Sequence, residues 1–194
     1  PRVAVVDVRH RLWIWDLSTN QVRALATDVH PNFTFHPKGD RIACMRGTIP
    51  EFHLVLLHVD KGTVQTLTPR ATSSWGPAFS PDGKQIAFVY SPDGFPSIYT
   101  VEIAYGSLRQ ITNRGLTAAR LKGCRTCLAP FPVGRLGLVW RGASLIFTTR
   151  KDTAVVRIAD GRVSRMHGVT LVWPVPPDRV VVRDGQGAQS LLTG

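Results

Sequence analysis

The sequence predicts an all-β protein built from repeated antiparallel sheets, and three observations favour this fold class. Glycine (17 residues) and proline (14 residues) are spread along the whole chain of 194 residues, as expected for short strands joined by turns. Glutamate, a strong helix former, occurs only at Glu51 and Glu102. The third observation is an internal repeat with a period of 44 residues.

The repeat relates residues 35–68 to residues 79–112 without a gap. Each copy contains a strand, a Pro-x-Gly turn and a second strand, followed by two further strands around another glycine. Four antiparallel strands in a unit of this length indicate a propeller blade. The identities are Phe35, Pro37, Gly39, Ile42, Ala43, Gly62 and Thr68, which recur as Phe79, Pro81, Gly83, Ile86, Ala87, Gly106 and Thr112.

Weaker copies of the unit extend over the rest of the chain. Residues 12–25 align with residues 54–67, residues 155–166 repeat the second turn around Gly161, and residues 172–184 repeat the first turn. We therefore expect a single β-propeller domain over residues 1–194, with about five four-stranded antiparallel blades. The first blade lacks an inner strand and the last an outer strand, so the ring is either small or part of a larger one. The predicted units are 1–27, 28–68, 69–112, 113–167 (with a basic insertion at 114–135) and 168–194.

Residues 80–112 resemble the TolB-type, WD-like propeller repeat. The family's successive motifs are found at Trp75, Ser80 to Lys84, Asp93-Gly94, Ile98-Tyr99 and Ile111-Thr112. The likeness is specific over residues 29–112 and faint elsewhere. It implies a scaffold that binds a protein partner as an accessory subunit of an envelope or membrane-associated assembly. The implied location is periplasmic or otherwise extracytoplasmic.

In an antiparallel meander, alternate loops fall on the same side of the disc. The loops between blades therefore share one face with the loops between second and third strands, and the Pro-x-Gly turns lie on the opposite face. We call the first the loop-rich face, and binding residues commonly lie on such loops. The residues predicted to contact a partner there are Arg46, Arg70, Trp75, Tyr90, Phe95, Arg114, Arg120, Lys122, Arg125, Arg135 and Arg150.

The formal net charge of +11 is unevenly distributed along the chain. Residues 1–100 carry a net charge of +2, whereas residues 101–194 carry +9. Such asymmetry indicates an anionic partner, either an acidic protein or an anionic membrane surface. A basic module that docks on anionic lipid or nucleic acid is thus one alternative, although no aromatic and basic residues interleave as in known nucleic-acid modules. The other alternative is a propeller domain that gates a larger prolyl-oligopeptidase-type hydrolase.

The sequence predicts no enzymatic activity, no cofactor and no metal site. It contains no nucleophile elbow, P-loop or zinc-protease motif, and most aspartates adjoin glycine or proline at turns. Cys124 and Cys127 have CxxC spacing but no second pair, so we interpret them as free thiols or one local disulfide. No stretch approaches the ~20 apolar residues of a transmembrane helix. Trp13 and Trp15 are expected to pack in the core of a blade.

Overall fold

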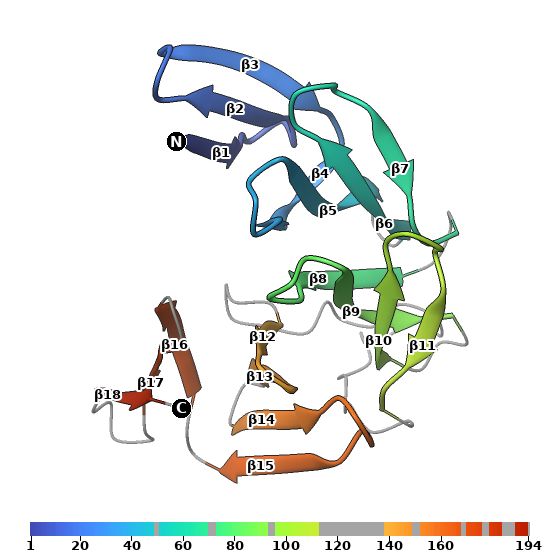
Figure 1. Cartoon of the computed structure of the whole chain (residues 1–194), viewed down its shortest axis with the longest axis vertical. Helices are drawn as coiled ribbons and strands as arrows, with labels where there is room; N and C mark the ends of the chain where they lie inside the picture. Colours follow the sequence, from blue (N-terminus) through green and yellow to red (C-terminus); the bar gives the residue numbers. More distant parts are fainter. Residues whose placement is uncertain are drawn as a thin grey trace.

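A computed structural model describes residues 1–48, 51–69, 73–92, 96–112, 138–148, 152–167, 170–175, 179–183 and 189–193. These residues form five antiparallel sheets arranged in an arc around a common centre (Figure 1). The sheets contain three, four, four, four and three strands in chain order, and the described part of the chain has no helix. The predicted all-β propeller with incomplete first and last blades is therefore confirmed.

Each sheet is a meander of strands that follow one another in sequence, and we number the sheets as blades 1 to 5. Blade 1 contains β1 (Arg2–Val6), β2 (Leu12–Asp16) and β3 (Gln21–Ala26). Blade 2 contains β4 (Val29–Phe35), β5 (Arg41–Thr48), β6 (Glu51–His58) and β7 (Val64–Thr66). Blade 3 contains β8 (Ser73–Phe79), β9 (Gln85–Ser91), β10 (Ser97–Glu102) and β11 (Leu108–Gln110). Blade 4 contains β12 (Val139–Arg141), β13 (Ser144–Thr148), β14 (Asp152–Arg157) and β15 (Val163–His167), and blade 5 contains β16 (Thr170–Val175), β17 (Arg179–Arg183) and β18 (Gln189–Thr193). The unit boundaries between the blades stay a prediction.

The sequence repeat is also a repeat of hydrogen bonds. In blade 2 the amide of Leu54 donates to the buried hydroxyl of Thr68 at 2.8 Å. In blade 3, 44 residues later, the amide of Ile98 donates to the buried hydroxyl of Thr112 at 2.9 Å. Each threonine thus satisfies an amide group of the third strand of its blade, which explains why threonine occupies both positions.

The Pro-x-Gly turns have the backbone geometry that their sequence predicts. Gly39 and Gly83 have φ angles of 73° and 72°, a region that glycine adopts readily. In the second turn the Ser80 hydroxyl donates to Asp82 at 2.6 Å and accepts from the amide of Gln85 at 2.9 Å. The serine and aspartate of this motif therefore act as turn formers.

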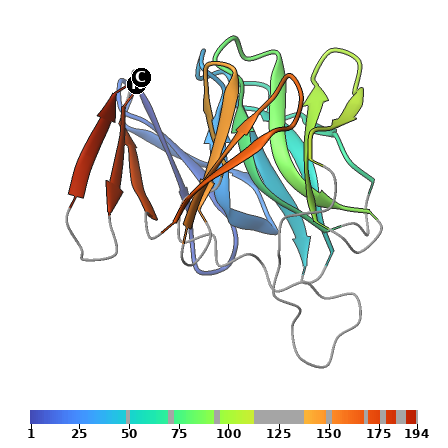
Figure 2. The same cartoon turned by 90° about the horizontal axis from the view of Figure 1, so that it is seen from below.

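The described residues form three apolar clusters, one between each pair of successive sheets from blade 1 to blade 4. In the cluster between blades 2 and 3, Met45 and Leu54 pack against Phe88, and all three side chains are buried. Inner strands such as β5 and β9 are covered on both faces. Their sequences are therefore nearly continuous runs of apolar residues. Blades 1 to 4 are consequently packed side by side, and the described turns lie at the two ends of their strands (Figure 2).

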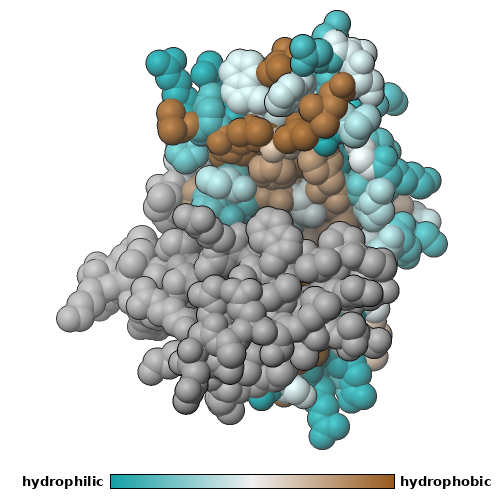
Figure 3. Space-filling model, turned by 90° about the vertical axis from the view of Figure 1, so that its left-hand side faces the viewer, coloured by the Kyte–Doolittle hydropathy of each residue, from teal (hydrophilic) through white to brown (hydrophobic). Residues whose placement is uncertain are grey.

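Blade 1 differs because only one of its faces is covered. Leu12 and Ile14 of β2 face blade 2 and are 0% and 2% exposed. On the opposite face Val5, Trp15 and Val22 are 53%, 42% and 59% exposed, and Figure 3 shows apolar side chains gathered there. The expectation that Trp15 packs in the core is therefore wrong, because its face of the sheet points away from blade 2.

Candidate partner-binding surface

The structure describes three of the eleven residues predicted to contact a partner, namely Arg46, Trp75 and Tyr90. The other eight lie outside the described residues: Arg70, Phe95, Arg114, Arg120, Lys122, Arg125, Arg135 and Arg150. The basic insertion at 114–135, together with its CxxC pair, is also outside them. For the undescribed residues, partner contact stays a prediction.

Trp75 and Tyr90 have a packing role. Trp75 lies on β8 and is 7% exposed, in the cluster between blades 3 and 4. Tyr90 lies on β9 and is 6% exposed, with its ring edge-on to Tyr99 at a centroid distance of 5.2 Å. The strands run further towards the loop-rich face than the sequence suggested, so positions expected in loops lie between sheets. Little of either side chain is left for a partner to contact.

Hydrogen bonds between main-chain groups bring three segments of blades 1 and 2 together on the loop-rich face. The amide of Val29, at the start of β4, donates to the carbonyl oxygen of His10 in the β1–β2 turn at 2.9 Å. The amide of Gly47 donates to the carbonyl oxygen of Asp28 at the same distance of 2.9 Å. The end of β5 therefore lies beside the link between β3 and β4.

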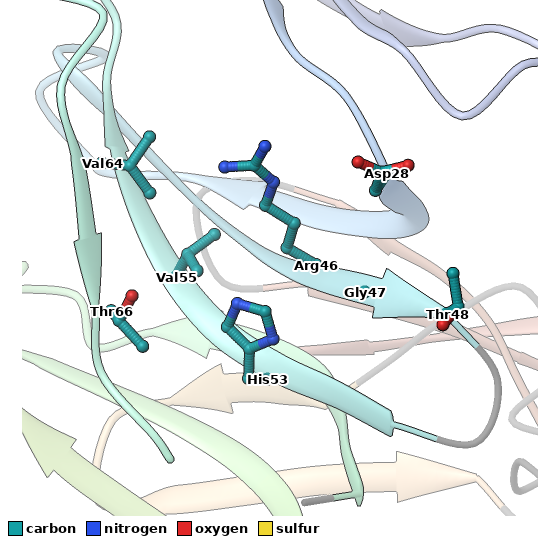
Figure 4. A pocket seen from close by; sticks show the side chains of 8 residues that line it. All are labelled: Asp28, Arg46, Gly47, Thr48, His53, Val55, Val64 and Thr66. Carbon is teal, nitrogen blue, oxygen red and sulfur yellow. The ribbon is translucent and has the colours of Figure 1, made fainter. Parts of the chain in front are cut away.

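Arg46 lines a cavity of about 510 Å³ at this junction (Figure 4). Arg46 and His53 are cross-strand partners on β5 and β6, and Val55 pairs with Thr66 on β7. These side chains lie on the face of blade 2 that packs against blade 1. The lining residues are Asp28, Arg46, Gly47, Thr48, His53, Val55, Val64 and Thr66.

Gly47 permits the close approach of chain segments that shapes this cavity. Its φ angle is 130°, and a Cβ atom there would overlap the carbonyl oxygen of Glu51. Asp28, whose carbonyl oxygen accepts from the Gly47 amide, has a φ of 58°, which aspartate tolerates better than most residues. A glycine inside a strand often marks such a close backbone approach, so Gly47 was the available sequence signal.

The cavity contains one fixed positive charge and one negative charge. The Nε–H of Arg46 donates to the carbonyl oxygen of Thr27 at 3.0 Å, which orients the guanidinium group. The Asp28 carboxylate accepts from the Thr27 hydroxyl at 3.0 Å. Figure 4 shows Arg46, His53 and Asp28 around the same space. No ion pair joins Arg46 to Asp28, so each charge can serve a ligand.

Two other titratable groups near this junction have shifted pKa values. Burial, together with the nearby His10, lowers the pKa of His30, whose ring packs edge-on against Phe52 at 5.2 Å. Burial raises the pKa of the Cys44 thiol to about 12 despite the opposing effect of Arg46. Cys44 is therefore a protonated core residue and unsuited to act as a nucleophile at neutral pH.

The aspartates in described turns form structural hydrogen bonds. The Ser80 hydroxyl, and then the amide of Lys84, lower the pKa of Asp82. The Arg157 guanidinium, and then the amide of Arg162, lower the pKa of Asp160. Among the described residues, no group of three or more histidine, cysteine, aspartate or glutamate side chains could hold a metal ion.

Comparison with solved structures gives matches over nearly the whole chain. TolB from Acinetobacter baumannii matches with a TM-score of 0.64 and 18% identity, covering 99% of this chain and 52% of that one. The putative TolB from Agrobacterium tumefaciens matches with a TM-score of 0.65 and 18% identity, covering 98% of this chain and 76% of that one. The fold is that of a TolB-type β-propeller. The chain spans about half the length of the Acinetobacter protein.

The same fold also occurs in enzymes. A structural study of two prolyl endopeptidases provides a match with a TM-score of 0.62 and 15% identity, covering 93% of this chain and 30% of that one. No protein-family model and no curated protein matches the sequence. Within the residues that the structure describes, no helix is long and apolar enough to cross a membrane.

Proposed function

We propose that this chain is a non-catalytic β-propeller scaffold that binds a protein partner through its loop-rich face. In this proposal it acts as an accessory subunit of an envelope or membrane-associated assembly in the periplasm. The observation that carries the proposal is the cavity at the loop-rich end of β5 and β6. There, Arg46 is held by rigid strands with the ends of its guanidinium group directed into an open space.

The likeness to TolB structures supports this role, because those proteins share the fold of this chain. The three interblade cores support it physically, since a rigid scaffold with variable loops is a common basis for recognition. The net charge of +9 over residues 101–194 favours an acidic surface on the partner.

The proposal is tested by reversing charge on one face at a time. Arg46→Glu, Arg114→Glu and Arg125→Glu together change residues that the sequence predicts on the loop-rich face. Lys38→Glu, Lys61→Glu and Lys84→Glu, all on exposed residues of turns on the opposite face, make a matched control with the same change in net charge. We expect the wild-type chain to retain a stoichiometric partner from an envelope extract at physiological salt.

The first triple variant should reduce capture at least ~10-fold, and the control triple variant should change it little. Equal losses in both variants, or no stoichiometric partner for the wild type, would contradict the proposal.

A second candidate function is that of a propeller domain within a larger prolyl-oligopeptidase-type hydrolase. The match to prolyl endopeptidases, of which this chain covers 30%, favours it specifically. The complete reading frame tests this candidate: an adjoining α/β-hydrolase segment with a nucleophile elbow would support it. A frame without such a segment would exclude it.

A further inference from the structure

We propose that the cavity lined by Arg46 binds a carboxylate side chain of an acidic peptide segment in the partner protein. This inference rests on the proposed partner-binding function and names the chemistry of one contact. The argument depends on the orientation of Arg46, the groups beside it, the negative charge opposite it and the size of the cavity.

The guanidinium group of Arg46 is held in place by one hydrogen bond, which uses only its Nε–H donor. Its Nε–H donates to the carbonyl oxygen of Thr27, which fixes the plane of the group. Among the described residues, no partner accepts a hydrogen bond from either terminal nitrogen atom of Arg46. These two nitrogen atoms form the parallel pair of donors that matches the two oxygen atoms of a carboxylate.

Two residues with hydroxyl groups line the same cavity as Arg46. Thr48 follows on the same face of β5, and Thr66 lies on β7 at the opposite wall. Figure 4 shows Thr66 on the opposite strand, and it shows Thr48 beyond the base of the Arg46 side chain, away from its guanidinium group. The peptide that carries the bound carboxylate would therefore have hydroxyl groups available for its other polar atoms within the same cavity.

Asp28 selects against an anion with more than one charge. Its carboxylate lines the same cavity, so it repels dianionic inorganic phosphate more strongly than a singly charged carboxylate. A peptide offers an acidic side chain to Arg46 and a backbone N–H group to Asp28. The pair of opposite charges thus favours an acidic peptide over inorganic phosphate.

The size and the walls of the cavity are consistent with a short peptide segment. Its volume of about 510 Å³ is within the ~300–1,000 Å³ range of ligand pockets. Val55 lines it and is fully buried in the cluster between blades 1 and 2. Because one wall belongs to this core, binding does not require the cavity to form first.

The test is an NMR titration of the uniformly ¹⁵N-labelled 194-residue chain with blocked tripeptides. The probes are acetyl-Gly-Glu-Gly-amide, the matching glutamine peptide and inorganic phosphate. We expect the glutamate peptide to shift the amide signals of Gly47, Thr48 and His53 and to saturate at ~1–10 mM. The glutamine peptide and phosphate should bind at least ~5-fold more weakly.

Arg46→Gln should weaken binding of the glutamate peptide at least ~10-fold, and Arg46→Lys should restore part of it because lysine keeps the charge but not the planar fork. Arg109→Gln is the matched control. The Arg109 guanidinium also donates to main-chain carbonyl oxygens, those of Ile158 at 3.3 Å and Ala159 at 3.1 Å, but it does not line the cavity. Well-dispersed amide spectra of all three variants will show that each is folded.

Several results would overturn the inference: equal binding of the two peptides, tighter binding of phosphate, no saturation below about 50 mM, or unchanged affinity in Arg46→Gln. If the whole partner is captured equally by wild type and Arg46→Gln, the carboxylate contact is wrong but the scaffold proposal stands. If the glutamate peptide binds but no partner is captured, the scaffold proposal fails and the cavity assignment stands.

Discussion

The two faces of blade 1 are both apolar, but they lie in different surroundings. On β2, Leu12 and Ile14 are buried against blade 2, while Trp15 on the opposite face is 42% exposed. The indole N–H of Trp15 donates to the side-chain oxygen of Asn20 at 3.0 Å, so the polar atom of this exposed side chain has a hydrogen-bond partner within the blade. The difference shows that an apolar strand face can be packed against a neighbouring sheet. Only the tertiary structure decides whether a neighbour covers that face.

A similar contrast separates the Pro-x-Gly turns of blades 2 and 3. Gly39 and Gly83 have nearly identical φ angles of 73° and 72°. A Cβ atom on Gly39 would meet nothing within 4 Å, whereas a Cβ atom on Gly83 would overlap the ring of His36. His36 is 3% exposed and also packs edge-on against Phe79 at 5.2 Å. The turn of blade 2 thus leaves space around Gly39, whereas in the turn of blade 3 the His36 side chain of blade 2 covers Gly83.

The largest expected effect is the loss of a covered side chain in blade 1. Ile14→Ala should lower the free energy of unfolding by about 2–5 kcal/mol, because it removes a buried side chain and leaves a cavity. Val5→Ala, on the uncovered face, should change it by only about 0.5 kcal/mol. Urea unfolding of both variants measures this difference. Equal losses would show that the outer face of blade 1 is covered in solution.

The two turn glycines should give a smaller difference. Gly39→Ala should cost about 1 kcal/mol, because alanine resists a positive φ angle. Gly83→Ala should cost about 1–3 kcal/mol more, because its methyl group must also displace His36. Thermal unfolding of the two variants tests this comparison. A Gly83→Ala protein as stable as Gly39→Ala would mean that the two turns do not pack together as described.

The smallest expected effect is the pH dependence of stability that arises from Asp7, beside the uncovered face of blade 1. The indole N–H of Trp13, which donates to Asp7 at 2.9 Å, and then the amide of Arg11 hold the pKa of Asp7 far below its usual range. A carboxylate with a lowered folded-state pKa stabilises the protein above its unfolded pKa of ~3.9, and this contribution is lost as the pH falls.

Asp7→Asn should therefore have a lower Tm than wild type at pH 7, and the difference should shrink as the pH falls below about 4. Melting curves between neutral and acidic pH provide the measurement. A difference in Tm that does not change with pH would rule out the ionised Asp7 carboxylate as its source.

Much of the fold could be predicted because its signals are local. The positions of Thr68 and Thr112, the glycines of the turns and the period of 44 residues depend on contacts within one blade. Strand alternation and turn chemistry therefore sufficed for the number of sheets and the strands in each. The burial of Trp75 and Tyr90 was missed because it depends on how far each strand extends beside the neighbouring blade.

The candidate site was only partly accessible from the sequence. The sequence predicted Arg46 on the loop-rich face, but it did not associate Asp28, His53 and Thr66 with Arg46. These residues come from different segments of the chain, and no motif or spacing relates them. Gly47 was the nearest signal, since its positive φ angle permits β5 to approach Glu51 and Asp28.

The amino-acid sequence by itself determined the repeating unit, its strands and its turns, because hydrogen bonds and backbone preferences within some 44 residues specify them. Only the tertiary structure decided which apolar faces are covered and which charged side chains share a cavity. Those properties arise where neighbouring blades meet, and the contacts there join residues that are remote in sequence.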